Sequence, residues 1–342
     1  MSEKLKTSET VEAKKEFTLA KAAALAGALF AATPEAVHAW DTIPEISPVQ
    51  TEQILKEAGL PESNEFSSAE VTHVIPSTNG QYIVQIRLMH KYGEQTSDEI
   101  NEIVTVQEQT YKTIQEIVES QEYATFYSEG AGSNYDSQME DKKDLEKKFL
   151  ELFYDALQEN GDVLDVEKIF EDIQDTYSAR YGGVMYPALK ENLASVLLNT
   201  LEYKNITLSE ENQTFVDSFI KKDYSKPSDG LYYNQGALEM AYMRGWVQNI
   251  DGCENESLMN SVNLVDGDVK SELIGKVNKQ REEYAITCIV KDLQKSGDSI
   301  AVVPIGGAHN FSQEIEDLGN GTGYIVLTPF SYPDVYKDVS MD

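Results

Sequence analysis

A short apolar run near the end of the chain most constrains the fold, because it stops at a glycine pair followed by a histidine. Residues 300–305 read IAVVPI, and Gly306, Gly307, Ala308 and His309 come next. An uninterrupted apolar run bounded by turn residues is typical of a strand that is buried on both faces. The run therefore predicts a strand of a parallel sheet, with a histidine just beyond its end.

Two other strand-like runs also stop at reactive side chains. Residues 81–89 read QYIVQIRLM and precede His90, and residues 124–128 read ATFYS and precede Glu129. Apolar residues at helical spacing predict a helix over 98–120 between them. Strand, helix and strand in this order predict a right-handed crossover and a parallel pair, so His90 and Glu129 are expected at the same carboxyl edge of the sheet.

The remaining elements of the predicted sheet lie on either side of these runs. Residues 71–75 and 81–89 flank an Asn79-Gly80 step, which is a signal for a β-hairpin. A long helix over 270–294 leads into the 300–305 strand, and a short helix over 309–318 and a strand over 324–328 follow. The reactive residues thus all fall at strand exits, where ligands of open α/β sheets bind.

The predicted fold class is α/β, with a largely parallel central sheet flanked by helices and a long all-helical insertion. The expected organisation is a candidate signal peptide over 1–39, a polar leader over 40–68, the first half of the α/β core over 69–136, the helical insertion over 137–270 and the second half of the core over 271–342.

The charge balance argues against nucleic acid as a partner. The 342 residues carry 59 Asp and Glu against 28 Lys and Arg, a formal net charge of -31. Such a charge repels a phosphate backbone. No apolar run reaches the length of about 18 residues expected of a membrane helix, so no transmembrane anchor is expected. Two cysteines, Cys253 and Cys288, are too few for a disulfide scaffold.

The N-terminal segment resembles a secretory signal. Three lysines precede an alanine-rich apolar stretch over 22–32, and small residues end near Ala39. Export to the periplasm or the extracellular space is the expectation. Acidic residues in the leading segment leave a second interpretation open, a simple alanine-rich helix.

Two imidazoles and one carboxylate are a ligand set for a divalent transition metal such as Zn, Fe, Mn or Co. His90, Glu129 and His309 are the candidate metal ligands and catalytic residues. A metal that they hold would activate water for hydrolysis, and without one a His and a Glu can activate water directly. Each residue also has an ordinary interpretation as a strand cap or a loop side chain that bonds its own backbone.

Five further residues are candidates for binding substrate. Arg281, on the long helix before the last motif, suits a substrate carboxylate or a developing oxyanion, although it is equally compatible with a solvated ion pair. Gln107 and Tyr111 lie four residues apart on the 98–120 helix and are expected to face the cleft, although Tyr111 also suits the core. Gly306 and Gly307 form the turn beside His309.

The order of these motifs resembles the superfamily of TraB pheromone-shutdown proteins, Tiki metalloproteases, ChaN haem-binding lipoproteins and erythromycin esterases. The closest likeness is Gly306-Gly307-Ala308-His309, which fits the Gly-x-x-His motif of that superfamily, with Arg281 and Glu129 at matching places. The first motif departs, because Arg87 stands where a glycine is usual. The likeness covers roughly 71–134 and 273–327.

The resemblance implies a metal-dependent hydrolase, peptidase-like or esterase-like, that acts on a peptide or a small-molecule ester. It also leaves open a non-catalytic protein that binds a peptide or haem in the same cleft, because members with both kinds of activity share one fold.

Overall fold

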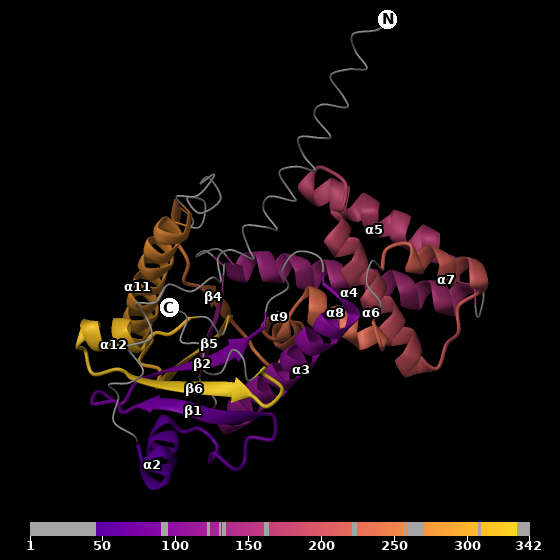
Figure 1. Ribbon diagram of the computed structural model, residues 1–342. Coiled ribbons are helices and arrows are strands. Elements are labelled where there is room, and N and C mark those ends of the chain that lie inside the picture. Colours follow the sequence, from indigo (N-terminus) through magenta and orange to yellow (C-terminus); the bar gives the residue numbers. More distant parts are fainter. Residues whose placement is uncertain are drawn as a thin grey trace, which may run out of the picture.

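The computed structural model describes residues 46–89, 95–121, 124–129, 131, 135–160, 164–220, 224–255, 257–258, 270–306 and 309–333 (Figure 1). The candidate signal peptide over 1–39 lies outside these residues, and so do His90 and Gly307.

A six-stranded sheet in the order β1-β6-β2-β5-β3-β4 forms the centre of the protein. The pairing of β1 with β6 is antiparallel, and the other pairings are parallel. This confirms the predicted α/β class with a largely parallel sheet. The strands are β1 (Ala69–Ile75), β2 (Tyr82–Leu88), β3 (Thr125–Ser128), β4 (Ile250–Gly252), β5 (Ile300–Gly306) and β6 (Gly323–Pro329).

Helices surround this sheet and extend to one side of it (Figure 1). None of those in the described ranges combines the length and the apolar character needed to cross a membrane. They are α2 (Pro48–Ala58), α3 (Ser97–Ser120), α4 (Tyr135–Asn160), α5 (Val166–Tyr181), α6 (Pro187–Lys204), α7 (Glu210–Asp217), α8 (Pro227–Asn234), α9 (Ala237–Met243), α11 (Lys270–Ser296) and α12 (Ser312–Leu318).

The three central strands are mostly apolar because both faces of the sheet are covered by helices. All seven residues of β2, β5 and β6 are buried. Alternate residues enter different cores: Val84 and Val302 pack with α2, α3 and α9, whereas Ile83 and Val303 pack with α11 and α12. Continuous apolar strands of this kind are expected where helices lie on both faces of a parallel sheet.

The predicted hairpin between 71–75 and 81–89 is wrong. Strand β6 lies between β1 and β2 and pairs with both. The Asn79-Gly80 step does make a tight turn, with Gly80 at φ 80°, but the turn crosses the end of β6, where the amides of Thr78 and Asn79 donate to the carbonyl of Gly321. A strand that is apolar on both faces gains more by pairing centrally than at an edge.

The long helical insertion has a core of its own. Phe149 and Phe153 of α4, Phe170 of α5 and Leu193 of α6 are buried in a cluster that excludes the sheet. The C-terminal part of the predicted insertion packs with the sheet instead. Residues of α9 lie in the sheet core, and β4 pairs with β3. The boundary that the sequence placed at residue 270 therefore differs from the structure, in which the sheet resumes before α11.

Strands β2, β5 and β3 lie side by side and run parallel, so their carboxyl ends meet at one edge. Leu88 at the end of β2 is in register with Gly306 at the end of β5. This agrees with the expectation that the residues following these strands are brought to one edge of the sheet.

Candidate functional site

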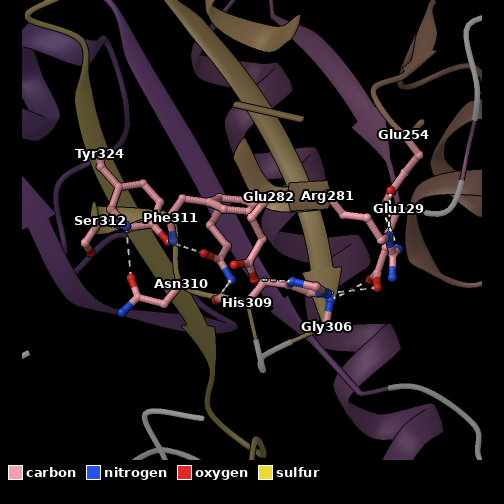
Figure 2. A network of polar contacts seen from close by, with 11 residues as sticks. Glu129, Glu254, Arg281, Glu282, Gly306, His309, Asn310, Phe311, Ser312 and Tyr324 are labelled. Atoms are coloured by element: carbon pink, nitrogen blue, oxygen red, sulfur yellow. Dashed lines mark hydrogen bonds and ion pairs between the residues drawn. The ribbon is translucent and has the colours of Figure 1, made fainter. Parts of the chain in front are cut away.

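Glu129 and His309 are brought together at this edge, although they are far apart in the sequence (Figure 2). Glu129 directly follows β3, and His309 follows the turn after β5. The Nε2 atom of His309 lies 3.4 Å from Oε1 of Glu129. Both side chains are largely enclosed, with exposed fractions of 11% and 19%.

The backbone of the β5 turn holds both residues in place. The N–H of Gly306 donates to Oε2 of Glu129 at 2.7 Å. The N–H of His309 donates to the carbonyl of Gly306 at 3.0 Å. Gly306, which the sequence suggested as a substrate contact, thus uses its amide to orient the carboxylate of Glu129.

Glu282 completes the surroundings of the histidine ring and was not predicted. Its Oε1 lies 2.7 Å from Nδ1 of His309, a distance typical of a charge-assisted hydrogen bond (Figure 2). The sequence did contain a signal. Glu282 lies three and four residues before Ala285 and Ile286, which are buried on the sheet-facing side of α11. An acidic residue on an otherwise apolar helix face is a candidate for a buried polar contact.

The two glutamates control the charge of the imidazole. Burial by itself lowers the pKa of His309, but the neighbouring carboxylates of Glu129 and Glu282 outweigh burial and raise the pKa to about 10, from an ordinary value of 6.5. The ring in this structure is therefore an imidazolium at neutral pH, placed between two carboxylates.

Arg281 is already paired with a carboxylate of the protein. Its Nε and Nη2 donate to the two carboxylate oxygens of Glu254 at 3.0 and 2.7 Å (Figure 2). The exposed fractions of the two side chains are 16% and 4%. Burial lowers the pKa of Arg281, whereas Glu254, Glu129 and Glu282 raise it by a larger amount. The predicted bidentate recognition of a carboxylate is thus realised within the chain, and the guanidinium remains a cation among acidic groups.

Gln107 and Tyr111 make different contacts from those expected. The side-chain amide of Gln107 donates to the carbonyl of Met89 at 3.1 Å and accepts from the N–H of Ala237 at 2.8 Å. The ring of Tyr111 packs edge-on against Tyr232 with centroids 5.9 Å apart. Gln107 thus ties the residue after β2 to the start of α9, and Tyr111 belongs to the core, as its alternative interpretation held.

Neither cysteine is an activated nucleophile. Cys253 is buried and Cys288 half-buried, and both are free thiols. Burial, reinforced by the neighbouring Glu254 and Asp292 respectively, raises the pKa of each thiol. A nucleophilic cysteine requires the opposite shift.

Glu129 and His309 supply two candidate metal ligands, and the third, His90, lies outside the described residues. Within the described residues no group of three or more His, Cys, Asp or Glu side chains is arranged to hold a metal. A comparison of the chain with protein-family models, with curated proteins and with solved structures finds no match in any of the three. The likeness to the TraB-like superfamily therefore remains a prediction from the motifs.

Proposed function

We propose that this protein is a metal-dependent hydrolase, acting on a peptide or an ester, with His309, Glu129 and His90 as the metal ligands. The observation that carries the proposal is the geometry of the His309 ring. Its Nδ1 is held by Glu282 at 2.7 Å, and its Nε2 faces Oε1 of Glu129 at 3.4 Å.

The distance of 3.4 Å between Nε2 of His309 and Oε1 of Glu129 suits two ligands of one metal ion better than it suits a hydrogen bond. Charge-assisted N–H···O bonds are about 2.7–2.9 Å long. Two ligand atoms bound at about 2.0–2.1 Å to a tetrahedral zinc ion lie about 3.3 Å apart. The separation of Nε2 and Oε1 is 3.4 Å, so a metal fits between them with little movement of either side chain. His90 would supply the third ligand, which leaves room for water and substrate.

The protein groups around this pair match the roles that such a site needs. Glu282 holds the proton on Nδ1, so a metal that displaces the proton of Nε2 would meet the lone pair of this nitrogen. The amide of Gly306 fixes Oε2 of Glu129, and Oε1, which faces Nε2 of His309, would be the atom that binds the metal. Arg281 places a positive charge near the site, where an oxyanion develops during acyl transfer. A bound metal would polarise the carbonyl and lower the pKa of its water.

The decisive test combines metal content with hydrolysis. Protein prepared without chelators is expected to hold about one divalent metal per chain and to cleave a reporter ester or peptide. His309→Gln and Glu129→Gln are expected to lose both properties. Glu151→Gln, a change at an exposed position of α4, is the matched control and should retain both. Metal-free wild-type protein that does not hydrolyse the reporters after metal is added would reject the proposal.

A non-catalytic binding protein is the second candidate, and the ion pairs of His309 favour it. Both ring nitrogens face carboxylates, so the charged site is already satisfied without a metal. Such a network can bind a peptide without turnover. Saturable binding of a peptide that the wild type never cleaves, and that Glu129→Gln also leaves intact, would select this function.

A further inference from the structure

A glutamine side chain lies in the middle of the central strand, where the surroundings are apolar. Gln85 of β2 is fully buried, and its register neighbours are Val303 of β5 and Val326 of β6. A buried side-chain amide without hydrogen-bond partners destabilises the folded state. Gln85 therefore requires specific partners, and those partners show what it does.

The partners of Gln85 belong to the segment that carries His309. Its Nε2 donates to the main-chain carbonyl of His309 at 2.9 Å. Its Oε1 accepts a hydrogen bond from the hydroxyl of Tyr324. The same hydroxyl oxygen accepts from the N–H of Phe311 at 3.4 Å (Figure 2).

Tyr324 is suited to this bridging position. It is fully buried in β6, and burial raises the pKa of its hydroxyl, so the group stays neutral and keeps its proton for Gln85. The two side chains thus hydrogen-bond the backbone on both sides of Asn310: Gln85 bonds the carbonyl of His309, and Tyr324 bonds the amide of Phe311. They come from two adjacent, fully buried strands, and buried core strands open less readily than other parts of a protein.

We propose that Gln85 and Tyr324 are positioning residues that fix the imidazole of His309 between Glu129 and Glu282. The catalytic meaning of this inference rests on the proposed function, whereas the placement of the ring does not. A displacement of about 1 Å in a reacting group is enough to lower a rate about 100-fold, which is why a rigid support matters.

A purely structural role would have a different signature. If the pair only satisfied buried polar groups, its loss would lower stability and leave the ring of His309 in place. If the pair positions the ring, its loss changes the contacts of Nδ1 and Nε2 even in protein that remains folded.

Gln85→Leu removes the amide and Tyr324→Phe removes only the hydroxyl, so the second variant is the safeguard if the first does not fold. The matched control is Asn212→Leu in the insertion. Asn212 also bridges two backbone groups, because it donates to the carbonyl of Leu164 and accepts from the N–H of Val166. Thermal unfolding is expected to show a loss of stability in all three variants.

The deciding readout is the ¹⁵N spectrum of the imidazole nitrogens at constant pH, in protein labelled at its four histidines. His309→Gln assigns the resonances of His309. Both positioning variants are expected to shift the Nδ1 and Nε2 resonances of His309, whereas Asn212→Leu leaves them unchanged. Unchanged resonances in both positioning variants would overturn the inference.

Kinetics add a second readout in protein that hydrolyses a reporter. Tyr324→Phe is expected to lower kcat about 10-fold to 100-fold with KM within about twofold. An unchanged kcat would contradict the inference. If wild-type protein has no hydrolase activity, the proposed function fails alone, and the spectra still decide whether Gln85 and Tyr324 position the ring.

Discussion

At the scale of single residues, the charge on His309 links the site to the stability of the protein. The pKa of His309 is about 10 in the folded chain against an ordinary value of 6.5. A raised pKa means that the folded state binds the proton more tightly than the unfolded state. The stabilisation is therefore fully present below about pH 6.5 and is lost as the pH rises toward 10.

We expect the free energy of unfolding of the metal-free wild type to fall between pH 7 and pH 10 relative to that of His309→Gln. The slope of this difference can reach about 1.4 kcal/mol per pH unit for one proton. Urea unfolding at a series of pH values measures it. A difference that stays constant with pH would show that the folded protein does not hold an imidazolium at this position.

Glu282 contacts the imidazole of His309 but is not itself a proposed metal ligand, so its contribution to metal affinity can be tested separately. Glu282→Gln weakens the support of Nδ1, and loss of such a partner lowers metal affinity by about 10-fold to 100-fold. Glu283→Gln is the control, because Glu283 is the exposed neighbour of Glu282 on α11. Titration with a metal-sensitive dye measures both affinities. Equal affinities in the two variants would remove Glu282 from the site.

The sequence indicated the pair at the centre of the site but not its surroundings. Glu129 and His309 were found because both follow apolar runs, and parallel strands bring their ends to one edge. Glu282 was missed because helical spacing was used to find apolar side chains rather than the acid among them. The backbone partners of Gln107 were not predicted, because periodicity shows which face of a helix is buried and not which atoms that face contacts.

At the scale of elements, α3 begins with a capping box. The side chain of Thr96 accepts from the N–H of Glu99 at 3.3 Å, and the side chain of Glu99 accepts from the N–H of Thr96 at 2.8 Å. This helix carries Gln107, which holds the backbone of Met89 after β2.

Thr96→Ala is expected to lower the free energy of unfolding by about 1 kcal/mol, because it removes one side of the capping box. Thr105→Ala on the same helix is the control. Thr105 is exposed in the helix interior, where alanine has the higher helix propensity, so no loss is expected. Guanidinium denaturation of both variants tests the difference. Similar losses would mean that the cap does not stabilise α3.

The first and last residues of the helices and strands were predicted more accurately than the pairing of the strands. The helix expected over 98–120 spans Ser97–Ser120, and the run at 300–305 became β5 at Ile300–Gly306. These limits follow from local periodicity and turn residues. The wrong hairpin prediction shows that local patterns do not reveal which strands pair. Strand β6, which separates β1 from β2, lies at the other end of the chain.

At the scale of the whole molecule, the main hydrophobic cluster of the helical insertion is distinct from the two clusters of the sheet, and a small cluster of Val196, Leu231 and Met240 joins α6 to α8 and α9. The insertion cluster is centred on Phe170, whose ring lies 5.1 Å from Phe149 and 4.9 Å from Phe219, centroid to centroid. The sheet clusters contain no residue of α5, α6 or α7 among those described. The two parts are therefore expected to respond separately to core mutations.

Phe170→Ala is expected to destabilise the insertion by about 3–5 kcal/mol through the cavity it leaves. Hydrogen exchange should show lost protection in α5, α6 and α7 and unchanged protection in β2, β5 and β6. Phe330→Ala is the control, since Phe330 is 50% exposed and its removal should change little. A loss of protection that spreads equally to the sheet would contradict the separation.

The central claim is that this fold gathers Glu129 and His309 into one metal site. Diffraction from crystals grown with zinc, recorded at the zinc absorption edge, tests it most directly. We expect an anomalous peak about 2.0–2.2 Å from Nε2 of His309 and from Oε1 of Glu129, with Nδ1 still bonded to Glu282. Zinc-soaked crystals without a peak there, and with the imidazole still facing both carboxylates, would contradict it.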